Sequence, residues 1–160
     1  MGKVARVFEE LTVYREALEV DAAVYAIRGR LSEASPGLWD QIDRSAGSVA
    51  DNIAEGFGRE TRADFRNFLR YSRASAMETR SQLYRAAQRR IVSRDEVAEL
   101  IERIKTLEVR IRNFQTYLSR AAKQASTYES KSSVVREPFL EWPSSNPEFA
   151  IPAWWDAVVE

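Results

Sequence analysis

Five arginines recur along one stretch of the chain at spacings that bring them together on a helix. At 100° per residue they fall within about 80° of one another. We call this set the arginine stripe: Arg62, Arg66, Arg70, Arg73 and Arg80. None has an Asp or Glu three or four positions away, the spacing at which helical ion pairs form. Because each like-charge step of four residues costs roughly 0.2–0.5 kcal/mol in an isolated helix, we expect negative charge from elsewhere to offset the stripe.

Three sources of that negative charge are open: carboxylates of the first helix or of a neighbouring subunit, an acidic C-terminal tail, or phosphates. The alternative is a stripe that is simply solvated. A guanidinium donates two parallel hydrogen bonds to phosphate oxygens, so arginine suits the third source. With Arg59 just upstream, the stripe is a predicted binding surface for RNA or single-stranded DNA, without sequence-specific readout. Tyr71 and Tyr84 are either stacking partners for bases or residues of a core or interface.

The segment Gly56-Phe57-Gly58 resembles a glycine loop but is predicted to be a hinge between two helices. A phosphate loop follows a strand and leads to Lys-Ser or Lys-Thr, and neither feature is present here. We expect Gly56 to be a left-handed helix cap and Phe57 to fold back over the bundle. Asn52 and Glu55 are candidates to bond the exposed amides of this turn.

Enzymatic and metal chemistry have little support in the sequence. The chain has no Cys and no His, which removes thiol catalysis, the commonest general base and the commonest transition-metal ligand. Four acidic residues of the second predicted helix invite a metal-binding interpretation: Asp40, Asp43, Asp51 and Glu55. Two of them lie four residues before an arginine and are explained as ordinary helical pairs. We therefore expect a protein that is not an enzyme and has no cofactor or metal.

The elements that must position the stripe are four amphipathic helices, recognised from apolar residues that recur every three or four positions. The predicted helices run from a Thr12 cap to near Gly29, from Leu38 to Glu55, from a Thr61 cap to about Arg90, and from a Ser93 cap over 94–124, with Ser32 to Gly37 as a loop. On the last helix we expect three local ion pairs: Glu99 with Arg103, Glu102 with Lys105, and Glu108 with Arg112. The predicted fold is an all-α, up-and-down antiparallel four-helix bundle over residues 1–125.

Residues 126–160 differ from the rest of the chain. Residues 1–125 have 22 basic and 18 acidic side chains, whereas the tail has two basic and six acidic ones, so the whole chain has zero net charge. The tail is rich in proline and contains Trp142, Trp154 and Trp155, which predicts irregular structure that docks on its own bundle, on a neighbouring subunit or on a partner protein. Without a secretory signal or an apolar stretch of about 20 residues, a cytoplasmic location is expected.

One set of residues resembles a known family. The matching residues are Phe8 to Tyr14, Gly37-Leu38, Gln41-Ile42, Arg44, Ala46, Ser48, Asn52-Ile53-Ala54-Glu55-Gly56-Phe57-Gly58-Arg59, Phe65 and Phe68-Leu69. They resemble the bacterial 23S rRNA intervening-sequence proteins, which form four-helix bundles, over about residues 8–120. That family is in turn similar to the accessory variability determinant proteins of diversity-generating retroelements. The resemblance implies a homopentamer that binds nucleic acid and a reverse transcriptase. The alternative is an oligomeric scaffold whose Trp-rich tail docks a partner.

Overall fold

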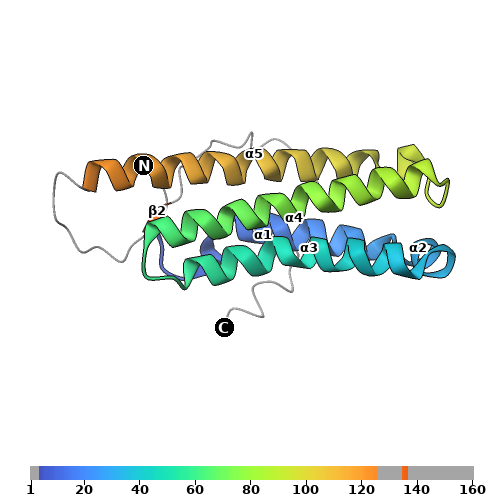
Figure 1. Ribbon diagram of the computed structural model, residues 1–160, viewed down its shortest axis with the longest axis horizontal. Helices are drawn as coiled ribbons and strands as arrows, with labels where there is room; N and C mark the ends of the chain where they lie inside the picture. The colour runs from blue at the N-terminus through green and yellow to red at the C-terminus, as the bar shows by residue number, and fades with distance from the viewer. Residues whose placement is uncertain (1–3, 126–134, 137–160) are drawn as a thin grey trace.

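The computed structural model describes residues 4–125 and 135–136, and residues 8–125 form a bundle of helices (Figure 1). The α-helices are α1 (Thr12–Ala26), α2 (Arg28–Ala34), α3 (Pro36–Phe57), α4 (Arg62–Gln88) and α5 (Arg94–Ala125), preceded by the short 3-10 helix η1 (Phe8–Glu10). The long helices α3, α4 and α5 run along the long axis of the molecule, joined by short turns. The prediction of an all-α bundle is confirmed, but the described residues contain five α-helices where four were predicted, because the first helix ends at Ala26 and α2 follows it.

The core forms where these helices meet. Helix α3 packs on α4, α4 packs on α5, and α1 packs on both α3 and α5. Of the apolar positions expected to face inward on α4, Phe65, Leu69, Ala76 and Leu83 are buried and Ala87 is half-buried. Phe65 meets Phe114 of α5 edge to face, with ring centroids 5.3 Å apart. Because each helix buries one apolar stripe, its opposite face is left for charged residues.

Two of the three predicted N-terminal caps are confirmed. The Asp64 amide donates to Thr61 Oγ1 at 3.0 Å, and the Glu96 amide donates to Ser93 Oγ at 3.2 Å. The cap predicted at Thr12 is wrong, because Thr12 is already the first residue of α1 and Leu11 precedes it in an extended conformation. Leu11 is fully buried. Packing of an apolar side chain, rather than a side-chain hydrogen bond, therefore fixes where α1 begins.

The loop predicted from Ser32 to Gly37 is also wrong. Helix α2 continues to Ala34, and α3 begins at Pro36 after a single connecting residue. Leu31 is fully buried and holds α2 against the bundle. Proline is favoured in the first turn of a helix because its missing N–H is not needed there, so Pro36 opens α3 instead of breaking it.

The turn between α3 and α4 reverses the chain as expected, but by a different backbone route. Gly56 is helical, and Gly58 caps α3 with φ −72°, so the left-handed cap predicted at Gly56 is wrong. No glycine of the described residues has a positive φ. Phe57 does fold back, and its ring meets Phe65 edge to face at 6.0 Å. Asn52 does not bond the turn but donates to the Ser48 carbonyl at 2.6 Å.

Part of the C-terminal tail has regular structure. Strand β2 (Val135–Arg136) pairs antiparallel with β1 (Val4–Ala5), so the expectation of an irregular tail is wrong for these two residues. The three tail tryptophans, Trp142, Trp154 and Trp155, lie outside the described residues. Within the described part of the chain, no helix combines the length and the apolar character that a membrane crossing requires.

Candidate nucleic-acid interface

Helix α4 carries the arginine stripe on the flank that faces α5. Its start is fixed by the Thr61 cap and its orientation by buried Phe65 and Leu69. Since helix geometry places residues three and four apart on one side, the stripe runs beside this buried face. α5 then decides which of the five guanidinium groups acquire a partner, and the sequence pattern of α4 alone gives no information on that.

Arg66 is held by α5 through neutral groups. Its Nη1 donates to Ser119 Oγ at 3.2 Å, and Gln115 Nε2 donates to the Arg66 backbone carbonyl at 3.3 Å. Both partners are uncharged, so they orient Arg66 without cancelling its charge. The guanidinium is therefore positioned and still positive.

Arg80 is neutralised by a carboxylate. Its Nε lies 3.0 Å from Glu108 Oε1, with side-chain exposures of 24% and 14%. Burial raises the pKa of Glu108, while the charges of Arg80 and Arg73 act in the opposite direction. The spacing along the last helix predicts Arg112 as the partner of Glu108, but α5 turns this carboxylate towards α4. A protein carboxylate is thus the counterion of Arg80, supplied by the last helix rather than the first.

The remaining stripe residues, Arg62, Arg70 and Arg73, have no ion-pair partner in the described part of the chain. Arg70 is exposed, and Arg62 and Arg73 are half-buried. Within the described residues, none of their three guanidinium groups has a hydrogen bond or ion pair, although the charge of Arg73 lowers the pKa of Glu108. Because adjacent like charges repel, this side of α4 favours an anion.

Arg59 stands apart from the stripe, in the turn before α4. It forms the predicted ion pair with Glu55, and its guanidinium lies over the Phe68 ring, 4.7 Å from the centroid. Phe68 in turn meets Tyr71 edge to face at 5.8 Å. The Arg59 guanidinium is therefore already occupied by local contacts with Glu55 and Phe68.

The two candidate stacking residues are exposed but lie in different settings. Tyr71 is 59% exposed and Tyr84 is 50% exposed. Tyr84 follows Arg80 by one helical turn, and both are close enough to Lys105 of α5 to influence its pKa. Tyr71 instead packs edge to face against the Phe68 ring, which also contacts Arg59. Lys105 is a basic residue near the stripe that the sequence pattern does not assign to it, because only the packing of α5 on α4 brings it there.

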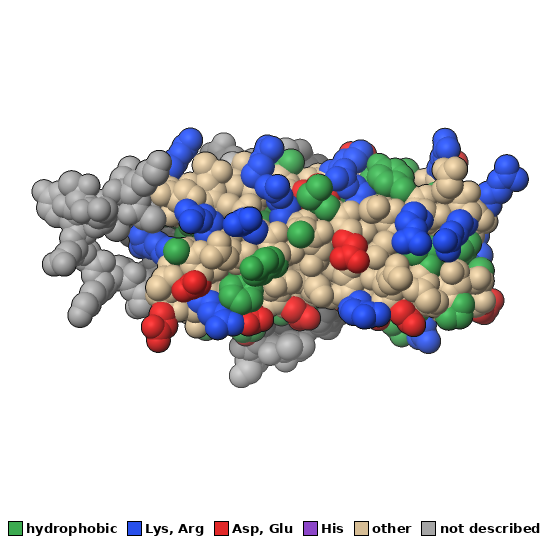
Figure 2. All heavy atoms as spheres, in the orientation of Figure 1, with side chains coloured by type: hydrophobic (Ala, Val, Ile, Leu, Met, Phe, Trp, Pro, Cys, Tyr) green, Lys and Arg blue, Asp and Glu red, His purple; other side chains and the backbone are tan. Residues whose placement is uncertain are grey.

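Charge is segregated between helices. Helix α4 carries six arginines against two acidic side chains, whereas α3 carries four acidic side chains against one arginine. In Figure 2, Lys and Arg side chains gather mostly over α5 and α4, and Asp and Glu mostly along the edge formed by α3. This face therefore presents a basic side and an acidic side to any charged partner.

The acidic side extends onto α1. Burial raises the pKa of Asp21, and the charges of Asp43 and Asp51 raise it further. Burial likewise raises the pKa of Tyr14, together with the charges of Glu9 and Asp51. Among the described residues, no group of three or more Asp and Glu has the arrangement to hold a metal ion. This surface is expected to repel a polyanion.

Comparison with known proteins places the chain in a family. The family profile of the 23S rRNA-intervening sequence protein matches residues 9–113. The chain belongs to this family. Its fold is shared with a crystal structure of a protein of unknown function from the S23 ribosomal protein family of Bacteroides thetaiotaomicron VPI-5482, at a TM-score of 0.59 and 22% identity, covering 62% of this chain and 94% of that one. No curated protein matches the chain. The resemblance predicted from the Asn-Ile-Ala-Glu-Gly-Phe-Gly-Arg segment is confirmed at the level of family.

Proposed function

We propose that this intervening-sequence family member is a non-enzymatic accessory protein that binds RNA or single-stranded DNA through the arginine stripe. The observation that carries the proposal is that, within the described residues, the guanidinium groups of Arg62, Arg70 and Arg73 have no ion-pair partner. Beside them, Arg66 is held only by neutral groups. From Arg62 to Arg73 the helix advances about 16 Å. A surface of this length contacts several phosphates of one strand at once.

The stripe is better suited to a phosphate chain than to a single acidic side chain. Arg80 shows how a protein carboxylate satisfies a stripe arginine, with Glu108 at 3.0 Å. The other positions have no such carboxylate within the described residues. Arginine binds phosphate through its planar fork and releases counterions on binding, which makes the affinity insensitive to sequence and sensitive to salt.

The test compares two double variants of equal charge. Arg62→Gln with Arg70→Gln removes two uncompensated stripe residues, and Arg6→Gln with Arg44→Gln removes two exposed arginines elsewhere. Binding of a fluorescent RNA and of single-stranded DNA is measured by anisotropy across a salt series. We expect the stripe variant to weaken binding at low salt and to reduce the slope of log K against log salt by roughly 0.7 per lost phosphate contact. Equal effects of both variants, or no binding by the wild type, would rule out the stripe as the interface.

Assembly and partner choice form a second part of the proposal. Following the family resemblance, we propose a homopentamer that acts with a reverse transcriptase or another nucleic-acid enzyme. A closed symmetric ring repeats the stripe in each subunit and so increases avidity for a long strand. Native mass spectrometry gives the subunit number, and a monomer at working concentration would contradict this part without affecting the single-stripe measurement.

A further inference from the structure

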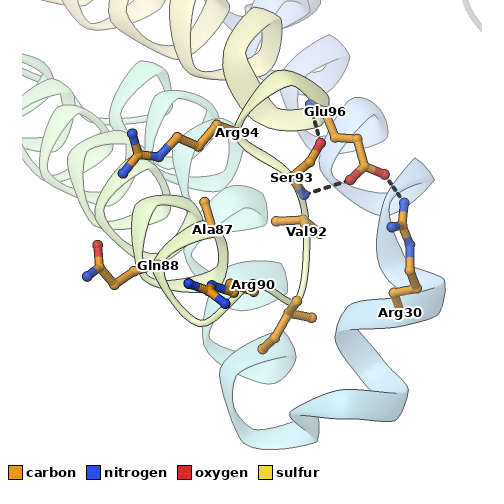
Figure 3. A pocket seen from close by; sticks show the side chains of 9 residues that line it. Arg30, Ala87, Gln88, Arg90, Val92, Ser93, Arg94 and Glu96 are labelled. Atoms are coloured by element: carbon orange, nitrogen blue, oxygen red, sulfur yellow. Dashed lines mark hydrogen bonds and ion pairs between the residues drawn. The ribbon is translucent and has the colours of Figure 1, made fainter.

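A second group of arginines surrounds a cavity at the other end of α4. The cavity has a volume of about 550 Å³ and lies where the loop between α4 and α5 passes α2 (Figure 3). Its lining includes Arg30 of α2, Arg90 of the loop and Arg94 at the start of α5. None of these residues belongs to the arginine stripe, so a ligand of this cavity is independent of the function proposed for the stripe.

One of the three arginines is already neutralised. Arg30 forms an ion pair with Glu96, and the second carboxylate oxygen of Glu96 accepts the Ser93 amide at 2.7 Å. Ser93 Oγ in turn accepts the Glu96 amide at 3.2 Å. These contacts form a capping box, which occupies amides at the start of α5. They also engage both oxygens of Glu96, the one carboxylate among the described residues that line the cavity. An incoming anion therefore has to be recognised by the other side chains.

Arg90 and Arg94 remain available. Neither guanidinium group has a hydrogen-bond or ion-pair partner within the described part of the chain, and Arg90 bonds only through its backbone amide, to the Ala87 carbonyl at 3.0 Å. Arg90 has a left-handed backbone with φ 58°, and the Ile91 amide donates to the Ala86 carbonyl at 3.1 Å across it. Figure 3 shows both guanidinium groups extending to the side of the loop where Gln88 lies, whereas Glu96 and Arg30 lie on the other side of Ser93.

We infer that this cavity binds a terminal phosphate, meaning a phosphate monoester carried by a nucleotide or by the end of a nucleic-acid strand. A monoester has a charge of about −1.5 to −2 at pH 7, which matches the charge of the two guanidinium groups that have no ion-pair partner among the described residues. Each guanidinium can donate two parallel hydrogen bonds to it. A phosphodiester inside a strand has only one charge and is a weaker match. Gln88 adds an amide donor, while Ala87 and Val92 supply an apolar wall for the organic part of the ligand. The volume is within the range of about 300–1,000 Å³ typical of small-molecule sites.

The test uses calorimetry at constant ionic strength with inorganic phosphate, adenosine 5′-monophosphate and adenosine. A 5′-phosphorylated oligonucleotide and its 5′-hydroxyl counterpart are compared by anisotropy. The pocket variant is Arg90→Gly with Arg94→Gln, since glycine keeps the left-handed backbone accessible. The charge-matched control is Arg85→Gln with Arg89→Gln, two exposed arginines near the same end that do not line the cavity.

We expect the wild type to bind the monophosphate at least about tenfold more tightly than adenosine. The pocket variant should abolish this difference because charge-assisted hydrogen bonds are lost, whereas the charge-matched control should keep it. Tighter binding of the nucleotide than of inorganic phosphate would support a nucleotide, and preference for the phosphorylated strand would support strand ends. Equal affinity for inorganic phosphate and the nucleotide would overturn the assignment to an ester-bound phosphate. Absence of any preference for the phosphorylated probe, or an equal loss in the control, would overturn the inference. The stripe variant Arg62→Gln with Arg70→Gln should leave binding of inorganic phosphate and nucleotide unchanged, which separates the two sites.

Discussion

Gly56 lies in the last turn of α3 and packs closely against α4. A Cβ atom added at Gly56 would lie 2.5 Å from Phe68 Cβ and 2.8 Å from Phe65 Cδ2. The Phe68 Cβ is fixed to its helix backbone and cannot rotate away. Gly56→Ala therefore requires α3 and α4 to separate, and we expect the variant to be less stable than the wild type.

The expected change in the free energy of unfolding of Gly56→Ala results from two opposing effects. Overpacking a well-packed core costs typically about 1–3 kcal/mol. Replacing glycine by alanine in a helix interior returns about 0.5–1 kcal/mol, and less at a helix end such as this one. The net loss is about 1–2 kcal/mol, which lowers the Tm by roughly 2–8 °C in a protein of this size.

Gly47 of the same helix is the matched control. A Cβ added there meets nothing closer than Asp21 Oδ1 at 3.9 Å, an ordinary contact. Gly47→Ala should therefore gain only the helical preference, about 0.5–1 kcal/mol, and raise the Tm. Thermal unfolding is followed by circular dichroism at one fixed protein concentration, because any oligomer makes the Tm concentration-dependent. A Gly56→Ala variant as stable as Gly47→Ala would refute the close-packing explanation.

Three further predictions concern stability. Because its pKa is raised above the ordinary value of 3.8, Asp21 binds its proton more readily in the folded protein than in the unfolded chain. The free energy of unfolding should consequently fall as pH rises from about 4 through the raised pKa, and Asp21→Asn should flatten that dependence and stabilise the protein at pH 7, as urea titrations would show. Ser45→Ala removes buried hydrogen bonds to Thr79 at 2.8 Å and to Gln82 at 3.0 Å, so a loss of about 1–3 kcal/mol is expected in the same assay, and a loss below about 0.5 kcal/mol would contradict it. Ser93→Ala should cost about 1 kcal/mol and increase hydrogen exchange in the first turn of α5, whereas unchanged exchange would argue against the cap.

Local sequence patterns predicted those features that depend on neighbours along the chain. The caps at Thr61 and Ser93, the apolar faces of α4 and α5, and the pairs Glu99 with Arg103 and Glu102 with Lys105 are present as expected. Each depends on groups within four residues of one another, so the helix itself brings them together. The position of the arginines along one side of α4 results from the same periodicity.

Contacts between helices decided the rest. The sequence shows that the stripe lacks a local counterion, but only the approach of α5 reveals that Glu108 neutralises Arg80 and that Ser119 orients Arg66. Gly56 was expected to supply a left-handed turn, yet its missing side chain makes room for Phe68 of α4. The cavity containing Arg90 and Arg94 likewise exists only because α2 passes the α4–α5 loop. A sequence determines which groups share a helix face. The contacts between faces of different helices depend on the packing of segments that are distant in the chain. That packing decides which charged side chains acquire an ion-pair partner.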